Sequence, residues 1–191
     1  MFTDPTLARR PSKAVGLAVK VAAGLVLVLV AVIAFRDADA KPTGTSTSAK
    51  TFALPSLDGK KTIRLADFRG KPTVVNLYAS WCDICDLEMP GYAKASAQLK
   101  GKVNFIGVAS METGDPKLMP ERYDVTWWAL ALDVGGSNGS GLHDEYARGF
   151  GLPITAFYDA DGKLLRVHRG GLVGADLTDS LHELYRIDIK I

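Results

Sequence analysis

The chain has two cysteines, Cys82 and Cys85, which are separated by two residues in the stretch Trp81-Cys82-Asp83-Ile84-Cys85. Thiols at this spacing can exchange disulfides, supply half of a metal site or form a structural bridge. A closed metal site normally needs four ligands, and the chain has no other cysteine. The three histidines, all distant in sequence, are His143, His168 and His182. A bridge across two residues removes little entropy from the unfolded chain, so the spacing favours thiol–disulfide exchange.

The residues on either side of the pair predict a junction between a strand and a helix. An apolar, β-prone run at residues 73–79 precedes the cysteines. Apolar residues then recur at helical spacing, at Ile84, Leu87, Tyr92, Ala95 and Leu99. At a helix start, free backbone N–H groups and the helix dipole lower the pKa of a thiol from its usual value of about 8.5. Cys82 is therefore the candidate nucleophile, and Cys85, about one turn further on, is the candidate resolving thiol.

The remaining sequence alternates strand and helix patterns and ends with a hairpin and a helix. Strands are expected at 51–57, 61–65, 103–109 and 129–132, with helices at 116–123 and 142–150 and a glycine-rich loop at 135–141. A hairpin is expected at 154–158 and 163–169, followed by a helix with Leu177, Leu181 and Leu184 on one face. This order predicts an α/β fold with a central mixed sheet covered by helices and an N-terminal β-hairpin.

The first fifty residues predict an export segment. Three basic residues within 1–13 precede residues 14–35, a stretch of 22 that is apolar apart from Lys20. As a helix it would span about 33 Å, enough for a bilayer, with the N-terminus in the cytoplasm and the rest of the chain outside. A cleaved signal peptide is the alternative, because Ala38-Asp39-Ala40 fits a cleavage site. Under either interpretation the domain is exported. Residues 36–50 are expected to form a flexible tether.

Charge is distributed unevenly along the 191 residues, whose formal net charge is +2. Residues 1–50 hold seven Lys or Arg against three Asp or Glu, and residues 51–191 hold sixteen against eighteen. The exported domain is therefore mildly acidic, and the absence of a basic stripe in its sequence argues against a nucleic-acid partner. In an exported protein, two cysteines three positions apart are better suited to exchanging disulfides than to cross-linking the fold.

Four motifs occur in the order found in a known family. They are Phe52-Ala53-Leu54-Pro55-Ser56-Leu57-Asp58-Gly59, Gly70-Lys71-Pro72-Thr73-Val74-Val75-Asn76, residues 81–90 and residues 151–159. Together they resemble the membrane-anchored thiol-disulfide oxidoreductases of the TlpA/ResA type, over essentially all of residues 51–191. The resemblance implies a thioredoxin fold and a redox-active dithiol in place of any separate cofactor.

The resemblance also implies roles for single residues. Pro153 falls where these proteins carry a cis-proline beside the active cysteines, and Trp81 and Leu152 are expected to join it in binding substrate. Asn76 stands where thioredoxin itself has a buried aspartate that accepts a proton, so another group must take that proton. Glu88, one turn after the second cysteine, fits the place of an acidic residue near the thiols. A solvated surface carboxylate is the alternative for Glu88.

Several residues near the thiols modify this pattern. Pro90 lies inside the predicted helix and is expected to kink it, unless the helix simply restarts there. Ile84 replaces a proline often found before the second cysteine, and Ile154 replaces a threonine common after the cis-proline. Asp83 and Asp86 place negative charge near the first thiol and oppose the helix dipole. A less stabilised thiolate makes a stronger reductant, which favours reduction.

We therefore expect a membrane-tethered, extracytoplasmic reductase of disulfides in exported proteins. The resemblance implies apocytochrome c or copper-site proteins as substrates and a membrane thiol transporter as electron donor. Three alternatives stay open. The pair can run in reverse as a disulfide-forming oxidase, or bind Cu(I) in an assembly factor with His143 or His168. The third is a peroxiredoxin-like peroxidase, although Tyr78 and Ala79 do not match the Pro-x-x-x-Thr/Ser-x-x-Cys arrangement of that class.

Overall fold

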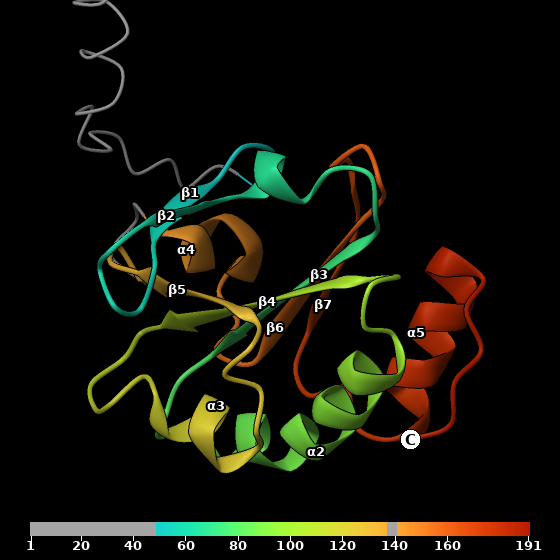
Figure 1. Ribbon diagram of the computed structural model, residues 1–191. Helices are drawn as coiled ribbons and strands as arrows, with labels where there is room; N and C mark the ends of the chain where they lie inside the picture. Colours follow the sequence, from blue (N-terminus) through green and yellow to red (C-terminus); the bar gives the residue numbers. More distant parts are fainter. Residues whose placement is uncertain (1–48, 137–140) are drawn as a thin grey trace, which may run out of the picture. The chain divides into compact units, whose positions relative to one another are not determined.

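A five-stranded mixed sheet is the centre of the computed structural model, which describes residues 49–136 and 141–191. The strand order is β5-β4-β3-β6-β7. The strands are β3 (Thr73–Tyr78), β4 (Asn104–Ser110), β5 (Ala129–Asp133), β6 (Ile154–Tyr158) and β7 (Leu164–Arg169). β3, β4 and β5 are parallel, whereas β6 runs antiparallel to both β3 and β7. The mixed sheet predicted from the sequence is thus confirmed (Figure 1).

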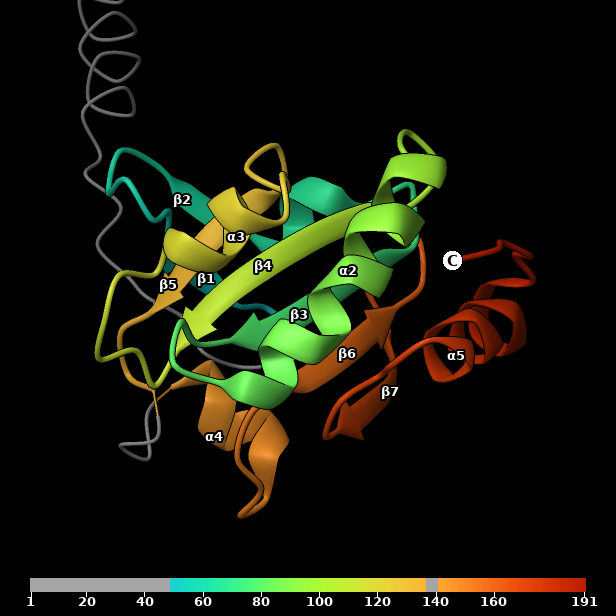
Figure 2. The ribbon, with the colours of Figure 1, turned by 90° about the horizontal axis from the view of Figure 1, so that it is seen from below.

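Both faces of the sheet are covered, which explains why all six residues of β3 are buried and mostly apolar. Val74 and Tyr78 point into a core shared with α2 (Asp83–Gln98) and α5 (Ala175–Tyr185). Val75 and Leu77, which alternate with them, point into a second core on the opposite face. Figure 2 shows α2 lying across the sheet, with α5 beside β7.

The opposite face is covered by the N-terminal elements and α4. β1 (Ala53–Pro55) and β2 (Thr62–Arg64) form the expected antiparallel hairpin, and the 3₁₀ helix η1 (Leu65–Phe68) follows it. The hairpin is shorter than the sequence predicted. The segment after β1 instead pairs with the edge strand β5, where the Leu57 amide donates to the Leu130 carbonyl at 3.1 Å. The hairpin thereby covers an edge that would otherwise expose unpaired backbone groups.

The remaining helices are short. α3 (Leu118–Arg122) lies within the expected range, and α4 (Leu142–Ala147) ends three residues earlier than predicted. Arg148 and Gly149, with φ of 48° and 89°, adopt the left-handed conformation that ends a helix. In α5, Leu177 and Leu181 are buried and Leu184 is half-buried, which confirms their shared face.

The expected membrane anchor at residues 14–35 lies outside the described residues, as do residues 1–13, most of the tether and part of the loop at 135–141. Across residues 49–136 and 141–191, none of the helices has the length and apolar character needed to cross a bilayer. The tether was expected to run to Lys50, but Ala49 already belongs to the fold. Its side chain is buried, and its carbonyl accepts a hydrogen bond from the Tyr158 hydroxyl at 2.6 Å.

Candidate active site

Cys82 and Cys85 are joined in a disulfide at the start of α2. Cys82 is the N-cap residue of the helix, and its Sγ accepts a hydrogen bond from the Cys85 backbone N–H at 3.2 Å. The sulfur therefore lies where the free N–H groups and the dipole of a 16-residue helix favour negative charge. This geometry confirms the strand-to-helix junction predicted from the sequence.

The two cysteines differ in their exposure to solvent. Cys82 is 6% exposed, whereas Cys85 is fully buried. An incoming disulfide can therefore reach Cys82 first, while Cys85 is placed to attack from inside the protein. This difference supports the predicted order of nucleophile and resolving thiol.

A carboxylate that the sequence analysis missed holds the segment leading to Cys82. Oε2 of Glu112 accepts from the Ser80 backbone N–H at 2.7 Å, and Oε1 accepts from the Ser80 hydroxyl at 2.6 Å. Partial burial raises the pKa of Glu112, but these bonds and two backbone N–H bonds outweigh it and hold the pKa below its usual value. Next to it, the Trp81 indole Nε1 donates to the Met111 carbonyl at 2.9 Å.

A topological signal for Glu112 was present in the sequence. β3 and β4 are adjacent parallel strands, so the residues that follow them meet at one edge of the sheet. Cys82 follows the first strand and Glu112 follows the second. An acidic residue just after the second predicted strand was therefore a candidate neighbour of the thiols.

Glu88 is a residue of α2, one turn after Cys85. It is only 1% exposed, so the alternative of a solvated surface carboxylate is wrong. Its Oε1 accepts from Asn76 Nδ2 at 2.7 Å, and its Oε2 accepts from the Leu172 backbone N–H at 2.8 Å. Burial raises the pKa of Glu88 to about 7, although both hydrogen bonds act to lower it. A carboxyl that titrates near neutral pH is suited to accepting and returning a proton.

Asn76 connects Glu88 to a buried polar network between α2 and the sheet. Its Nδ2 also lies 3.4 Å from Oγ1 of Thr155, which is 2.7 Å from the Tyr92 hydroxyl. Among the described residues, Asn76 Oδ1 has no hydrogen-bond partner. The structure therefore places the Asn76 amide in direct contact with the Glu88 carboxyl, inside a buried polar network.

The negative charge near the first thiol is smaller than the sequence suggested. Asp86 forms an ion pair with Arg122, with 2.5 Å between Oδ1 and Nη1, and its carbonyl accepts from the Tyr123 hydroxyl at 3.1 Å. Asp83 is exposed in the first turn of α2. Sequence spacing gave no sign of Arg122, because this residue comes from α3, 36 positions away.

The Leu152–Pro153 peptide bond is cis, as the resemblance implied. Strand register places it near the thiols, because Ile154 pairs with Leu77 at the end of β3 that leads to Cys82. Pro153 is buried, and the half-buried Leu152 packs against the core that contains both cysteines.

Exposed apolar side chains surround the disulfide. Ile84 contacts the loop before α5, where a Cβ added to Gly171 would lie 2.9 Å from Ile84 Cγ2 and 3.7 Å from Val173 Cγ2. Four side chains are about half or more exposed and form what we call the apolar rim: Trp81 (50%), Ile84 (51%), Leu87 (67%) and Val173 (51%). Exposed apolar surface beside a reactive group is suited to docking another protein chain.

Two other sequence expectations concern Pro90 and the histidines. α2 is one continuous helix from Asp83 to Gln98, so the alternative that it restarts at Pro90 is wrong, and the expected kink stays a prediction. His143 is buried in α4, and His168 is half-buried in β7. Within residues 49–136 and 141–191, no three His, Cys, Asp or Glu side chains gather in a way that could hold a metal ion, so neither histidine joins the cysteines in such a group.

Comparison with known proteins agrees with this geometry. The model of the AhpC/TSA family matches residues 45–167. The thiol-disulfide oxidoreductase ResA of Bacillus thuringiensis subsp. konkukian is 30% identical over 141 residues, which cover 71% of this chain and 76% of ResA. The thiol:disulfide interchange protein DsbE of Pseudomonas fluorescens biotype C is 34% identical over 113 residues, covering 58% of each chain. The solved structure of MTB DsbF, in mixed oxidised and reduced forms, is 26% identical with a TM-score of 0.59, covering 71% of this chain and 96% of DsbF.

Proposed function

The chain belongs to the AhpC/TSA family as a thiol-disulfide oxidoreductase of the ResA/DsbE type, and on this basis we propose that it reduces disulfides in exported proteins. Cys82 is the nucleophile, Cys85 the resolving thiol and Glu88 the proton acceptor. The domain works outside the cytoplasm, tethered by its N-terminal segment to the membrane. Apocytochrome c and copper-site proteins are the proposed substrates, and a membrane thiol transporter is the proposed electron donor.

The observation that carries this proposal is the position of the Cys82 sulfur. It caps α2, accepts the Cys85 N–H and belongs to the more exposed of the two cysteines, next to the apolar rim. Helix capping stabilises a thiolate in the reduced protein, and the apolar rim gives a substrate chain a surface to dock on. The cis-Pro153 bond lies at the same edge of the sheet and supports docking there.

The proposed reaction moves two electrons from the dithiol to the substrate. The Cys82 thiolate attacks one sulfur of the substrate disulfide, that bond breaks, and the departing substrate thiolate takes up a proton. Glu88, as a carboxylate, then accepts the proton of the Cys85 thiol. The Cys85 thiolate attacks Cys82, releases the second substrate thiolate and leaves the Cys82–Cys85 disulfide seen in the structure. The membrane donor must return two electrons before the next turnover.

The acidic groups in the first two turns of α2 support the reducing direction. Asp83 and an ionised Glu88 both disfavour a thiolate on the pair, and a less stabilised thiolate lowers the reduction potential. The ion pair of Arg122 with Asp86 reduces this effect without removing it.

The reduction potential of the pair, with its trapped redox state in cells, tests the direction. A potential near that of thioredoxin, about −270 mV, with mainly reduced cysteines in the cell, agrees with a reductase. A potential near that of DsbA, about −120 mV, with oxidised cysteines, would make the protein a disulfide donor and refute the reducing direction.

Two cysteine variants test the assigned roles. Cys85→Ser is expected to accumulate mixed disulfides between Cys82 and exported proteins, because the resolving thiol is missing. Cys82→Ser is expected to form none. If Cys82→Ser trapped substrates as well as Cys85→Ser did, the assignment of the nucleophile would be wrong.

A further inference from the structure

The positive charge of the domain is concentrated in its first elements. Residues 50–71 carry six Lys or Arg against two Asp, a net charge of +4, whereas residues 72–191 carry eleven against sixteen Asp or Glu, a net charge of −5. All six basic side chains are exposed: Lys50, Lys60, Lys61, Arg64, Arg69 and Lys71. Exposed cations that gather on one surface create a positive potential there, which acts over about 8 Å at physiological ionic strength.

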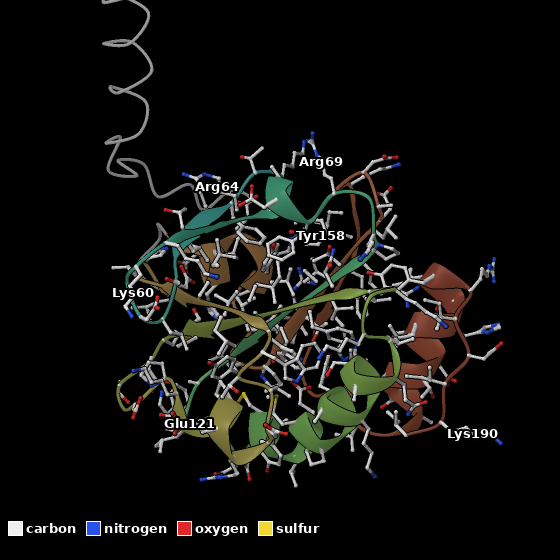
Figure 3. The ribbon with its side chains drawn as sticks, in the orientation of Figure 1. Lys60, Arg64, Arg69, Glu121, Tyr158 and Lys190 are labelled. Atoms are coloured by element: carbon white, nitrogen blue, oxygen red, sulfur yellow. A yellow bond between two sulfur atoms is a disulfide. The ribbon has the colours of Figure 1, made fainter. Side chains whose placement is uncertain are left out.

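Two of these arginines line a groove. It has a volume of about 250 Å³, and Arg64 and Arg69 contribute to it together with the first described residues and the turn at Gly162. Neither arginine forms an ion pair with any residue in the described part of the chain. Figure 3 shows both on the same side of the domain, away from Glu121 and Lys190. Guanidinium groups free of protein partners fit phosphate oxygens, which they bind through paired N–H bonds.

The chain enters the domain at this groove. Lys50 and Thr51 line it, and the preceding residue, Ala49, is fixed by the hydrogen bond from the Tyr158 hydroxyl. Thirteen residues, 36–48, separate Ala49 from the apolar stretch proposed as the anchor. Fully extended, they span at most about 45 Å. A tether this short gives the groove a high effective concentration at the membrane surface, which adds to the attraction of the groove itself.

We propose that this basic groove docks onto anionic phospholipid headgroups of the membrane that holds the N-terminal segment. The proposal rests on the membrane anchor of the proposed function. Charge complementarity and the point where the tether joins the domain both favour a lipid surface as the occupant. Each Lys or Arg close to an anionic surface strengthens binding about fivefold.

Docking through the groove leaves the thiols accessible. The groove is formed by β2, η1 and the residues before β1, on the sheet face that carries Val75 and Leu77. α2 and the disulfide belong to the opposite face. Along β3 the two regions also lie at opposite ends, since Arg69 precedes this strand and Cys82 follows it. The docked domain therefore turns Cys82 away from the bilayer, toward exported substrates.

The test uses the full chain, reconstituted in vesicles, with a protease site replacing tether residues 41–48. One set of vesicles is phosphatidylcholine alone, and the other contains roughly a third phosphatidylglycerol, giving the negative surface that the proposal needs. After cleavage of the tether, flotation measures how much of the domain stays on the vesicles. We expect retention on anionic vesicles at about 0.1 M salt, loss at about 1 M and no retention on neutral vesicles, because salt screens the attraction.

Matched charge reversals separate the groove from net charge. Arg64→Glu with Arg69→Glu is expected to weaken retention at least about 25-fold, from two lost cations at about fivefold each. Lys94→Glu with Lys190→Glu makes the same change in net charge at exposed positions outside the groove and is expected to keep retention. Equal release from both vesicle types, or equal weakening by both double variants, would overturn the docking proposal.

Two readouts in the same samples keep the outcomes distinct. Flotation before cleavage reports the anchor, and exchange with a soluble disulfide reports the redox function and the folding of each variant. If the uncleaved chain fails to float with neutral vesicles, the anchor is refuted. Salt-sensitive flotation with anionic vesicles then still tests whether the groove binds anionic lipid without an anchor. Exchange should run at the same rate on both vesicle types, and slower exchange on anionic vesicles would refute the outward orientation of Cys82.

Discussion

Replacing Glu88 by glutamine is expected to stabilise the fold at alkaline pH and to slow exchange there. Burial raises the pKa of this carboxyl from 4.5 to about 7, so the folded protein holds its proton over a range where the unfolded chain has released it. Stability therefore falls as pH rises from about 4.5 to about 7 and then levels off. A shift of this size corresponds to about 3 kcal/mol.

Glutamine removes the buried charge and keeps the shape of the side chain. Its oxygen can accept from the Leu172 N–H, and its amide can donate to Asn76 Oδ1 after a turn of the Asn76 amide. That oxygen has no hydrogen-bond partner within the described residues, so the new bond occupies a free acceptor. At pH 5, where Glu88 is neutral, we expect the variant and the wild type to differ little.

Urea unfolding of the oxidised proteins at pH 5 and pH 8 measures this difference. Between the two pH values, Glu88→Gln should gain about 3 kcal/mol relative to the wild type. Glu121→Gln, at an exposed position, is the control and should follow the wild type. The resolution step should slow by roughly 10²-fold at pH 8 and little at pH 5, because only the ionised carboxyl accepts a proton. Stability curves that stay parallel across pH would refute the argument.

Three further variants test other contacts of the site and the fold. Glu112→Gln places an amide N–H group opposite one of the N–H or O–H groups that now donate to Glu112. The free energy of unfolding in urea at pH 7 should therefore fall by about 1–3 kcal/mol. Because the pKa of Glu112 is lowered, this difference should be complete at pH 7 and shrink below about pH 4.5. Arg122→Ala frees the charge of Asp86, so pH-dependent alkylation of the reduced protein should show a higher pKa for the nucleophilic thiol, with little change in stability. Tyr158→Phe removes the hydrogen bond to the Ala49 carbonyl, and limited proteolysis should then cut faster at the start of the domain, whereas unchanged cleavage would contradict this role.

The sequence predicted the order and type of the strands well, because their signals are local. The run at 73–79 and the hairpin at 154–169 read as strands from their own apolar and turn residues, and the structure places strands there. Two predicted elements proved too long: α4 ends early at the left-handed residues Arg148 and Gly149, and the first strand is shortened where distant contacts begin. At the end of the predicted strand 51–57, Ser56 bridges to Ala131 and the Leu57 amide donates to the Leu130 carbonyl, both in β5.

The site was predictable to the extent that its residues lie on one helix. Cys82, Cys85 and Glu88 are spaced by one turn each, and this spacing was visible in the sequence. Glu112 and Arg122 were missed, because their contacts depend on which strands and helices become neighbours. The burial of Glu88 could not be predicted from the sequence either, since its surroundings include a backbone N–H 84 residues away.

The amide at position 76 and the carboxyl at position 88 are chemically complementary. The Asn76 side chain lies 2.7 Å from a Glu88 oxygen, at the position where thioredoxin itself carries a buried aspartate. Two carboxyls at that distance could not both ionise near neutral pH, so a protein with an acid on the helix gains from an amide on the strand. The amide donates to the ionised form of Glu88 and can accept from the protonated form after turning over. With Glu88 as the proposed proton acceptor, the accepting carboxyl lies on the helix, one hydrogen bond from the position of the thioredoxin aspartate.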